Sequence, residues 1–306
     1  MRNLRPGTVS LLAIGGLLLA VSAGGQANRT FVAANKGSDT GVCPPTAPCQ
    51  TLAYALTQTN AGGEVILLES GEYGTATITQ SVSVSVTPGI YAGITVGSGA
   101  GISVNAGVSD VVTLRGLSFI SFGGFSGVGV FQALGVHIEN CVFQGAFSGY
   151  DVDVEAATSV FIDGSSFKDF GVGILVSAPA PTATAVITRT RLENGLGTGI
   201  YAWNNSKVSA SQVVCSGVFI CFDSNPSSGA AELNLDDCVA TNSTFGVVTE
   251  GLGPGGIARV SDCTVTDNSN KGLVRFLGAL YTLQNNTVEG NASADLSGTI
   301  TPLSGK

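Results

Sequence analysis

The residues best suited to do chemistry recur at one interval along the sequence. Arg115, Glu139 and Asp163 follow one another at steps of 24 residues, and His137 and Phe161 are separated by the same step. Two neighbouring carboxylates can act as acid and base in glycoside cleavage, and Arg115 and His137 complete this set of candidate catalytic residues. Phe161 could stack on a sugar ring, so all five are candidate ligand-binding residues. On these residues alone, a solvated face on which Arg115 pairs with Glu139 is the favoured interpretation.

A second group of acids lies within a short segment that reads as a strand. Asp151, Asp153 and Glu155 alternate with valines, so we expect them on one strand face, about 7 Å apart. Hard cations prefer carboxylate oxygens, which makes these three residues candidate calcium ligands. Because this spacing is wide for one ion, a solvated strand edge is the favoured interpretation. No other cofactor is predicted.

Both groups of residues depend on an eight-residue template that recurs eight times. Its positions one, three, six and eight are apolar or small, and its copies begin at residues 112, 136, 160, 185, 208, 233, 258 and 281. Positions one and three alternate as on a strand, two residues then form a bend, and a later alternation such as Val128-Gly129-Val130 supplies a third strand. The repeat predicts an all-β fold, a single-stranded right-handed parallel β-helix with coils about 4.8 Å apart.

Stacking of the coils turns equivalent template positions into columns. Arg115, Glu139 and Asp163 share position four, whereas His137 and Phe161 share position two. Both positions are predicted to face outward, because positions one and three fill the interior. The five candidate residues should therefore form one compact surface patch.

The segment before the repeat contains the one predicted helix, Leu52 to Thr59, which should cap the open end of the β-helix. We expect a signal peptide at residues 1–27, a cap region at 28–63, the β-helix at 64–300 and a tail at 301–306. A retained membrane anchor is the alternative to a cleaved signal.

Seven cysteines in an exported chain favour some disulfides. Cys43 and Cys49 flank a proline-rich loop and are the predicted pair. Cys238 and Cys263 share one template position in adjacent coils, where two buried thiols are favoured over a bridge. A bridge between Cys215 and Cys221 is left open, as is the state of the remaining cysteine at position 141.

Composition narrows the choice of partners. Only 11% of the 306 residues are charged, and 43 are glycine, as suits a turn-rich β architecture. Loss of Arg2 and Arg5 with the signal takes the formal charge from −8 to −10. Such acidity disfavours nucleic acid and anionic membrane surfaces as partners. No membrane insertion is expected after signal removal, and the protein is predicted to be secreted or held at the cell surface.

Three short runs resemble a known family. They are Thr51-Leu52-Ala53-Tyr54-Ala55-Leu56, Gly62-Gly63-Glu64-Val65-Ile66-Leu67 and Gly71-Glu72-Tyr73. Together with the repeat, they resemble the N-terminal coils of the pectin-lyase-like superfamily, over roughly residues 30 to 300. The resemblance implies a β-helix, and a relation to polysaccharide lyases, hydrolases, tailspikes and adhesins.

The enzyme motifs of that superfamily do not carry over to this chain. Asp236-Asp237 is present without a Gly-His-Gly run, and the single histidine, His137, lies within the repeat. We therefore predict a protein that binds an extracellular glycan or surface partner along its lateral face without catalysis. A polysaccharide lyase or glycoside hydrolase and a structural surface element are the alternatives.

Overall fold

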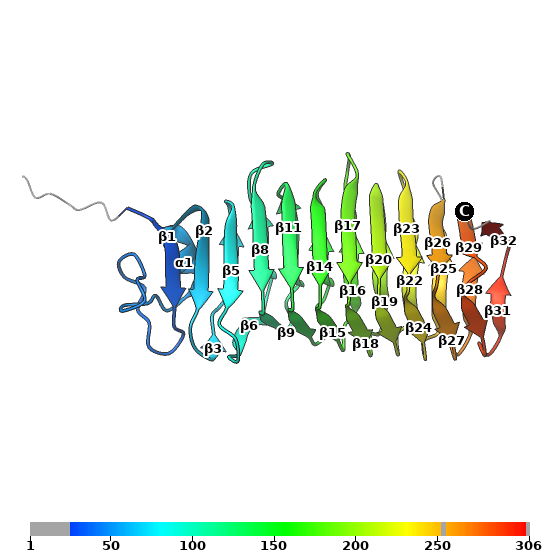
Figure 1. Ribbon diagram of the computed structural model, residues 1–306, viewed down its shortest axis with the longest axis horizontal. Helices are drawn as coiled ribbons and strands as arrows, with labels where there is room; N and C mark the ends of the chain where they lie inside the picture. The colour runs from blue at the N-terminus through cyan, green and yellow to red at the C-terminus, as the bar shows by residue number, and fades with distance from the viewer. Residues whose placement is uncertain (1–24, 252–254, 304–306) are drawn as a thin grey trace, which may run out of the picture.

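The computed structural model describes residues 25–251 and 255–303, so the predicted signal peptide lies almost entirely outside the described residues. Coils of β-structure stack along one axis, from helix α1 (Leu52–Gln58) to strand β32 (Ile300–Leu303) (Figure 1). Within the described ranges, no helix has the length and apolar character needed to cross a membrane.

Three parallel sheets run the length of the stack, and all paired strands come from successive coils. The predicted all-β fold with three strands per coil is confirmed. Sheet A contains β1 (Ala27–Val32), β2 (Thr59–Leu67), β5 (Val82–Val86), β8 (Val111–Arg115), β11 (Gly135–Glu139), β14 (Ser159–Asp163), β17 (Ala183–Thr188), β20 (Ser206–Ser211), β23 (Ala231–Asp236), β26 (Gly256–Ser261), β29 (Ala279–Leu283) and β32.

The other two sheets complete each coil. Sheet B contains β3 (Gly71–Glu72), β6 (Ala92–Val96), β9 (Ser118–Ser121), β12 (Val142–Gln144), β15 (Ser166–Lys168), β18 (Arg191–Glu193), β21 (Val214–Ser216), β24 (Val239–Thr241), β27 (Thr264–Thr266) and β30 (Thr287–Glu289). Sheet C contains β4 (Ala76–Ile78), β7 (Ala100–Asn105), β10 (Ser126–Gln132), β13 (Tyr150–Val154), β16 (Val172–Val176), β19 (Thr198–Ala202), β22 (Ile220–Ser224), β25 (Phe245–Thr249), β28 (Lys271–Arg275) and β31 (Ala294–Ser297).

The predicted register of sheet A holds for seven of the eight template copies. The eighth copy is shifted by one residue, because Ala258 pairs with Leu280 and Arg259 pairs with Tyr281. The coil that ends in β29 is one residue shorter than the template required. The shift turns Leu283, predicted to be internal, toward the outer face, where it lines a groove described below.

Left-handed backbone residues make the bend between sheets A and B. They occupy template position five with φ between 47° and 78°, and are Gly116, Asn140, Gly164, Arg189, Gln212, Asp237 and Asp262. Glycine and asparagine adopt this conformation readily, whereas Arg189 and Gln212 adopt it at some energetic cost. The predicted two-residue bend is therefore confirmed, and one left-handed residue in each of these coils produces it.

Small polar side chains inside this bend accept hydrogen bonds from its buried backbone N–H groups. The Cys141 N–H donates to Ser165 Oγ over 3.1 Å, and the Cys263 N–H donates to Asn286 Oδ1 over 2.7 Å. All five cysteines outside the N-terminal loop are buried free thiols. Two thiols at 238 and 263 agree with the favoured prediction, and Cys215 and Cys221 are not bridged.

The N-terminal end is closed by α1 and its preceding loop. The Thr51 side chain accepts a hydrogen bond from the Tyr54 N–H and caps the helix, which buries Leu52 and Leu56 against the first coils. Cys43 and Cys49 form the predicted disulfide, with their Cα atoms 5.0 Å apart. Sheet A extends beyond the predicted limits, because β1 and the first part of β2 lie in the expected cap and β32 in the expected tail.

Aromatic rings form one column of the interior. Phe119, Phe143 and Phe167 stack in successive strands of sheet B, with ring centroids 4.7 and 4.6 Å apart and no more than 1% of each residue exposed. Each ring therefore contacts the equivalent ring above or below it, as the coil spacing dictates.

Replacement of the middle ring tests this column. Phe143→Ala should lower the free energy of unfolding by about 3–5 kcal/mol, because it removes a buried ring and both of its stacking contacts. Urea denaturation followed by circular dichroism measures the change. Val142→Ala, on the outward face of the same strand, is the matched control. An equal loss in both variants would contradict the assignment of Phe143 to the core.

Candidate functional site

The outer face of sheet A holds the charged column predicted from the repeat. Glu139 pairs in register with Arg115 on one side and Asp163 on the other. The Arg115 guanidinium donates to Glu139 Oε2 over 2.7 and 2.8 Å. The predicted stacking of these three residues is therefore confirmed, and so is the Arg115–Glu139 ion pair.

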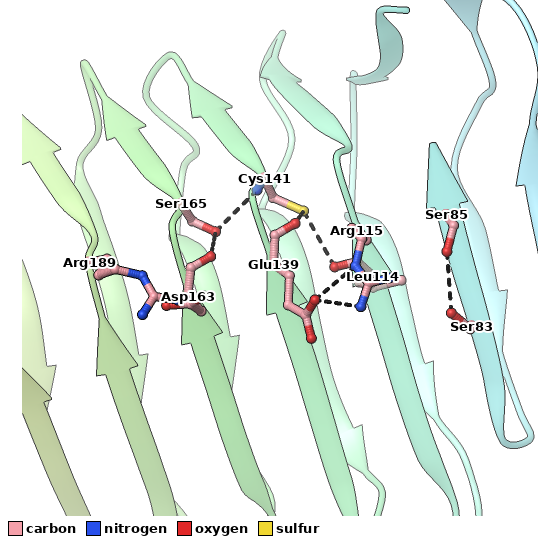
Figure 2. A network of polar contacts seen from close by, with 9 residues as sticks. All are labelled: Ser83, Ser85, Leu114, Arg115, Glu139, Cys141, Asp163, Ser165 and Arg189. Atoms are coloured by element: carbon pink, nitrogen blue, oxygen red, sulfur yellow. Dashed lines mark hydrogen bonds and ion pairs between the residues drawn. The ribbon is translucent and has the colours of Figure 1, made fainter. Parts of the chain in front are cut away.

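A fourth charged residue, Arg189, lies beside this column. It is at the bend of the following coil, and its guanidinium binds Asp163 (Figure 2). Asp163 also accepts from the hydroxyl of Thr188, its partner in the next strand. Figure 2 shows Arg115, Glu139, Asp163 and Arg189 in this order across successive coils. Each carboxylate is held by its own arginine instead of facing the other. The two carboxylates are therefore not arranged as the mutually facing acid–base pair that the sequence suggested.

The neighbouring column provides an apolar platform. The rings of His137 and Phe161 stack with centroids 4.7 Å apart and an interplanar angle of 12°. Phe161 is 39% exposed, and Val186 continues the column in the next coil with 41% exposed. The structure thus brings together all five predicted ligand-binding residues, on β8, β11 and β14.

Farther along sheet A the same face is hollowed into a groove of about 380 Å³. Its polar lining repeats template positions two and four over three coils: Ser209, Ser211, Asn234, Asp236, Arg259 and Ser261. Val186 bounds one end, and Leu283 and Leu303 bound the other. At the Val186 end, Ser209 and Ser211 are smaller than their partners Val186 and Thr188 in the preceding coil, which leaves space for the groove.

Within the groove the polar groups are only partly engaged. Arg259 donates to Asn234 Oδ1 over 3.2 Å and to Glu232 Oε2 over 3.1 Å. Asp236 is exposed and forms no ion pair with any residue that the structure describes. Sequence reasoning missed the groove, because serine and asparagine in a turn-rich chain carry no distinctive signal. Only their shared template positions could have indicated it.

The three candidate calcium ligands do not lie on one strand face, so the predicted shared face is wrong. The favoured solvated edge is also wrong for Asp151 and Asp153, because both are fully buried. The corner between sheets B and C turns Asp151 inward: Gly127 and Gly173, its equivalents in the flanking coils, face the core residues Phe143 and Leu192. Asp153 and Glu155 face outward. Within the described residues, no three His, Cys, Asp or Glu side chains converge as a metal site would require.

Two outward carboxyls of sheet C are nevertheless buried. Asp153 has no exposed surface and Asp223 is 3% exposed, and neither Asp153 oxygen has a hydrogen-bond partner. Burial, assisted by the charge of Glu155, raises the pKa of Asp153 from 3.8 to about 7. Burial and the charge of Glu250 raise the pKa of Asp223 to about 8. Sequence reasoning missed Asp223, because the template covered only the strands of sheets A and B.

Comparison with known proteins agrees with this architecture. The family model for the right-handed β-helix region matches residues 100–294. The chain belongs to the right-handed β-helix family. The resemblance to pectin-lyase-like proteins is thereby confirmed for the fold. No curated protein matches this β-helix chain.

Solved structures that resemble this β-helix include three carbohydrate-active enzymes. A rhamnogalacturonan lyase is 12% identical with a TM-score of 0.43, over 84% of this chain and 74% of its own. A lacto-N-biosidase from Eubacterium ramulus is 8% identical with a TM-score of 0.44, over 90% and 67%. A pectate lyase is 11% identical with a TM-score of 0.43, over 90% and 77%. At such identities the likeness concerns the fold alone.

The buried carboxyls of sheet C should make the stability of this β-helix depend on pH. Their folded pKa values exceed the unfolded value of 3.8, so the folded state binds more protons between about pH 4 and pH 8. Their contribution is fully present below pH 4 and is lost as the pH rises through 7 and 8.

Asp223→Asn should therefore stabilise the protein at pH 8 relative to pH 5 by on the order of 1 kcal/mol or more, since the amide cannot ionise. Urea denaturation at both pH values measures the difference. Glu289→Gln, at an exposed position, is the control. It should change the free energy of unfolding by the same amount at pH 5 and at pH 8. If the stability of Asp223→Asn changed with pH as much as that of the unaltered protein, the raised pKa of Asp223 would be contradicted.

Proposed function

We propose that this protein binds an extended, polyhydroxylated polysaccharide along the outer face of sheet A and does not cleave it. The observation that carries the proposal is the groove over β20, β23 and β26, which lies on the same face as the His137–Phe161 stack. A polymer that lies parallel to the axis meets one equivalent row of side chains per coil, about every 4.8 Å. Hydroxyl, amide and carboxylate groups in the groove can then bind successive sugar hydroxyls.

The state of the carboxylates favours binding over cleavage. Glu139 and Asp163 are engaged by Arg115 and Arg189, and both ion pairs are solvent-exposed. Freeing one carboxylate for proton transfer would break its ion pair with arginine. The roles of these residues in ligand binding, together with His137 and Phe161, are thus part of the proposal.

We place the protein outside the cell or at its surface. The predicted signal peptide at residues 1–27 would direct export, and the Cys43–Cys49 disulfide suits an oxidising compartment. An extracellular polysaccharide is a linear partner whose length matches an elongated lateral face.

Removal of polar groups from the groove tests the proposal. The double variant Asn234→Ala/Asp236→Ala should weaken polysaccharide binding about tenfold, because two hydrogen-bonding side chains contribute about 0.5–1.5 kcal/mol each. Isothermal titration calorimetry against neutral and uronate polysaccharides measures the dissociation constant. Ser216→Ala/Thr241→Ala removes two polar side chains from sheet B and is the matched control.

Product analysis on the same mixtures separates binding from turnover. New reducing ends or unsaturated products would identify an enzyme and overturn the non-catalytic proposal. Equal affinity in the groove variant and the control would remove the groove from the binding site.

A further inference from the structure

On the outside of the protein, residues near the C-terminal ends of the sheet C strands form a row that includes two aromatic side chains and a carboxylate. Ladder hydrogen bonds fix its register: the Glu155 N–H donates to Val130, Ser177 to Val154 and Trp203 to Val176, over 2.9 to 3.0 Å. Phe131, Glu155, Ser177 and Trp203 therefore occupy equivalent positions in four successive coils. Phe131 and Trp203 are three coils, or about 14 Å, apart.

Two adjoining cavities follow this row. One, of about 290 Å³, is lined by Phe131, Leu134 and Val108, and the other, of about 370 Å³, by Leu175, Ser177 and Trp203. Glu155 and Pro179 line both. A carboxylate thus stands between two hollows, each of which contains an aromatic ring.

The charge of this surface has one sign. None of the strands β10, β13, β16, β19, β22 and β25, nor the segments that join them to sheet A, contains a lysine or arginine. Glu155 is exposed and forms no ion pair within residues 25–251 and 255–303. The outer face of sheet A differs, because arginines there neutralise the carboxylates.

A buried carboxyl lies behind Glu155. Asp153 follows Gly129 in register, and a side chain at Gly129 would point at the Phe131 ring on the outer face. Asp153 thus points to the same side as Glu155, and neither of its oxygens has a partner. Buried carboxyls without partners are uncommon where no ligand or catalytic role explains them.

We propose that the paired cavities bind an oligosaccharide that carries ammonium groups, such as one built from hexosamine units. The ammonium lies beside Glu155, and sugar faces contact Phe131 and Trp203. A cation near an aromatic face and a carboxylate is attracted by both, and more strongly in a partly desolvated cavity. A uronate would be repelled by Glu155, and a neutral sugar would leave Glu155 without a counter-ion.

The ring stack around Trp203 supports this role. Tyr201, in β19, has its ring centroid 6.0 Å from that of Trp203, with an interplanar angle of 17°. The Tyr201 ring thus packs beside the Trp203 ring that lines the cavity. Because Trp203 is the only tryptophan of the chain, its fluorescence reports directly on occupation of this site.

Titration of the full chain with a β-1,4-linked glucosamine hexamer tests the proposal. The hexamer should change the Trp203 emission and bind at least tenfold more tightly than its N-acetylated counterpart or an oligogalacturonate of equal length. Glu155→Gln should weaken hexamer binding at least tenfold. Glu289→Gln removes the same charge from sheet B and should leave the affinity unchanged, with unaltered circular dichroism in both variants.

Three results would overturn the proposal: no fluorescence change and no heat with the hexamer, equal affinity for its acetylated form, or full affinity in the Glu155 variant. Tetramethylammonium is the remaining probe. If it bound as tightly as the hexamer, the site would recognise an ammonium headgroup and the sugar assignment would fail. The Asn234→Ala/Asp236→Ala variant should retain hexamer binding, so failure here is distinguishable from failure of the sheet A proposal.

Discussion

Hydrogen bonds between successive coils are the constraint from which the other features of this protein follow. Each inner strand donates to and accepts from the strands of both neighbouring coils, so successive coils must stay in register. A left-handed residue at the bend between sheets A and B keeps the path of each coil the same. Once the register is fixed, a residue type that recurs along the sequence becomes a column in space.

Because equivalent residues stack in columns, interior side chains contact their counterparts in adjacent coils, and buried polar side chains bind the backbone there. Phenylalanine rings at equivalent positions stack, because the spacing between coils is close to the centroid distance of stacked aromatic rings. At the bend, cysteine, serine and asparagine bind the backbone of the adjacent coil. The carboxyls of Asp151 and Asp153 break this rule, since neither finds a partner. Such local violations concentrate where a structure serves a purpose other than stability.

The same stacking gives the molecule two chemically different sides. On sheet A, each of two carboxylates pairs with an arginine, and the groove is lined by both polar and apolar side chains. Along the edge of sheet C, acids and aromatic rings gather on strands and joining segments that lack lysine and arginine. The stack thus holds two surfaces that differ in charge: arginines neutralise carboxylates on the first, and no basic residue accompanies Glu155 on the second.

The sequence by itself determined the fold, the register of most coils and the charged column on sheet A. These depend on a backbone period that is visible in the order of residues, so Arg115, Glu139 and Asp163 could be placed without coordinates. The ion pair of Asp163 with Arg189, the groove at Asn234 and the inward turn of Asp151 were decided only by the tertiary structure. They depend on side-chain size, on the direction of a corner residue and on a one-residue shift at β29, which a period cannot encode.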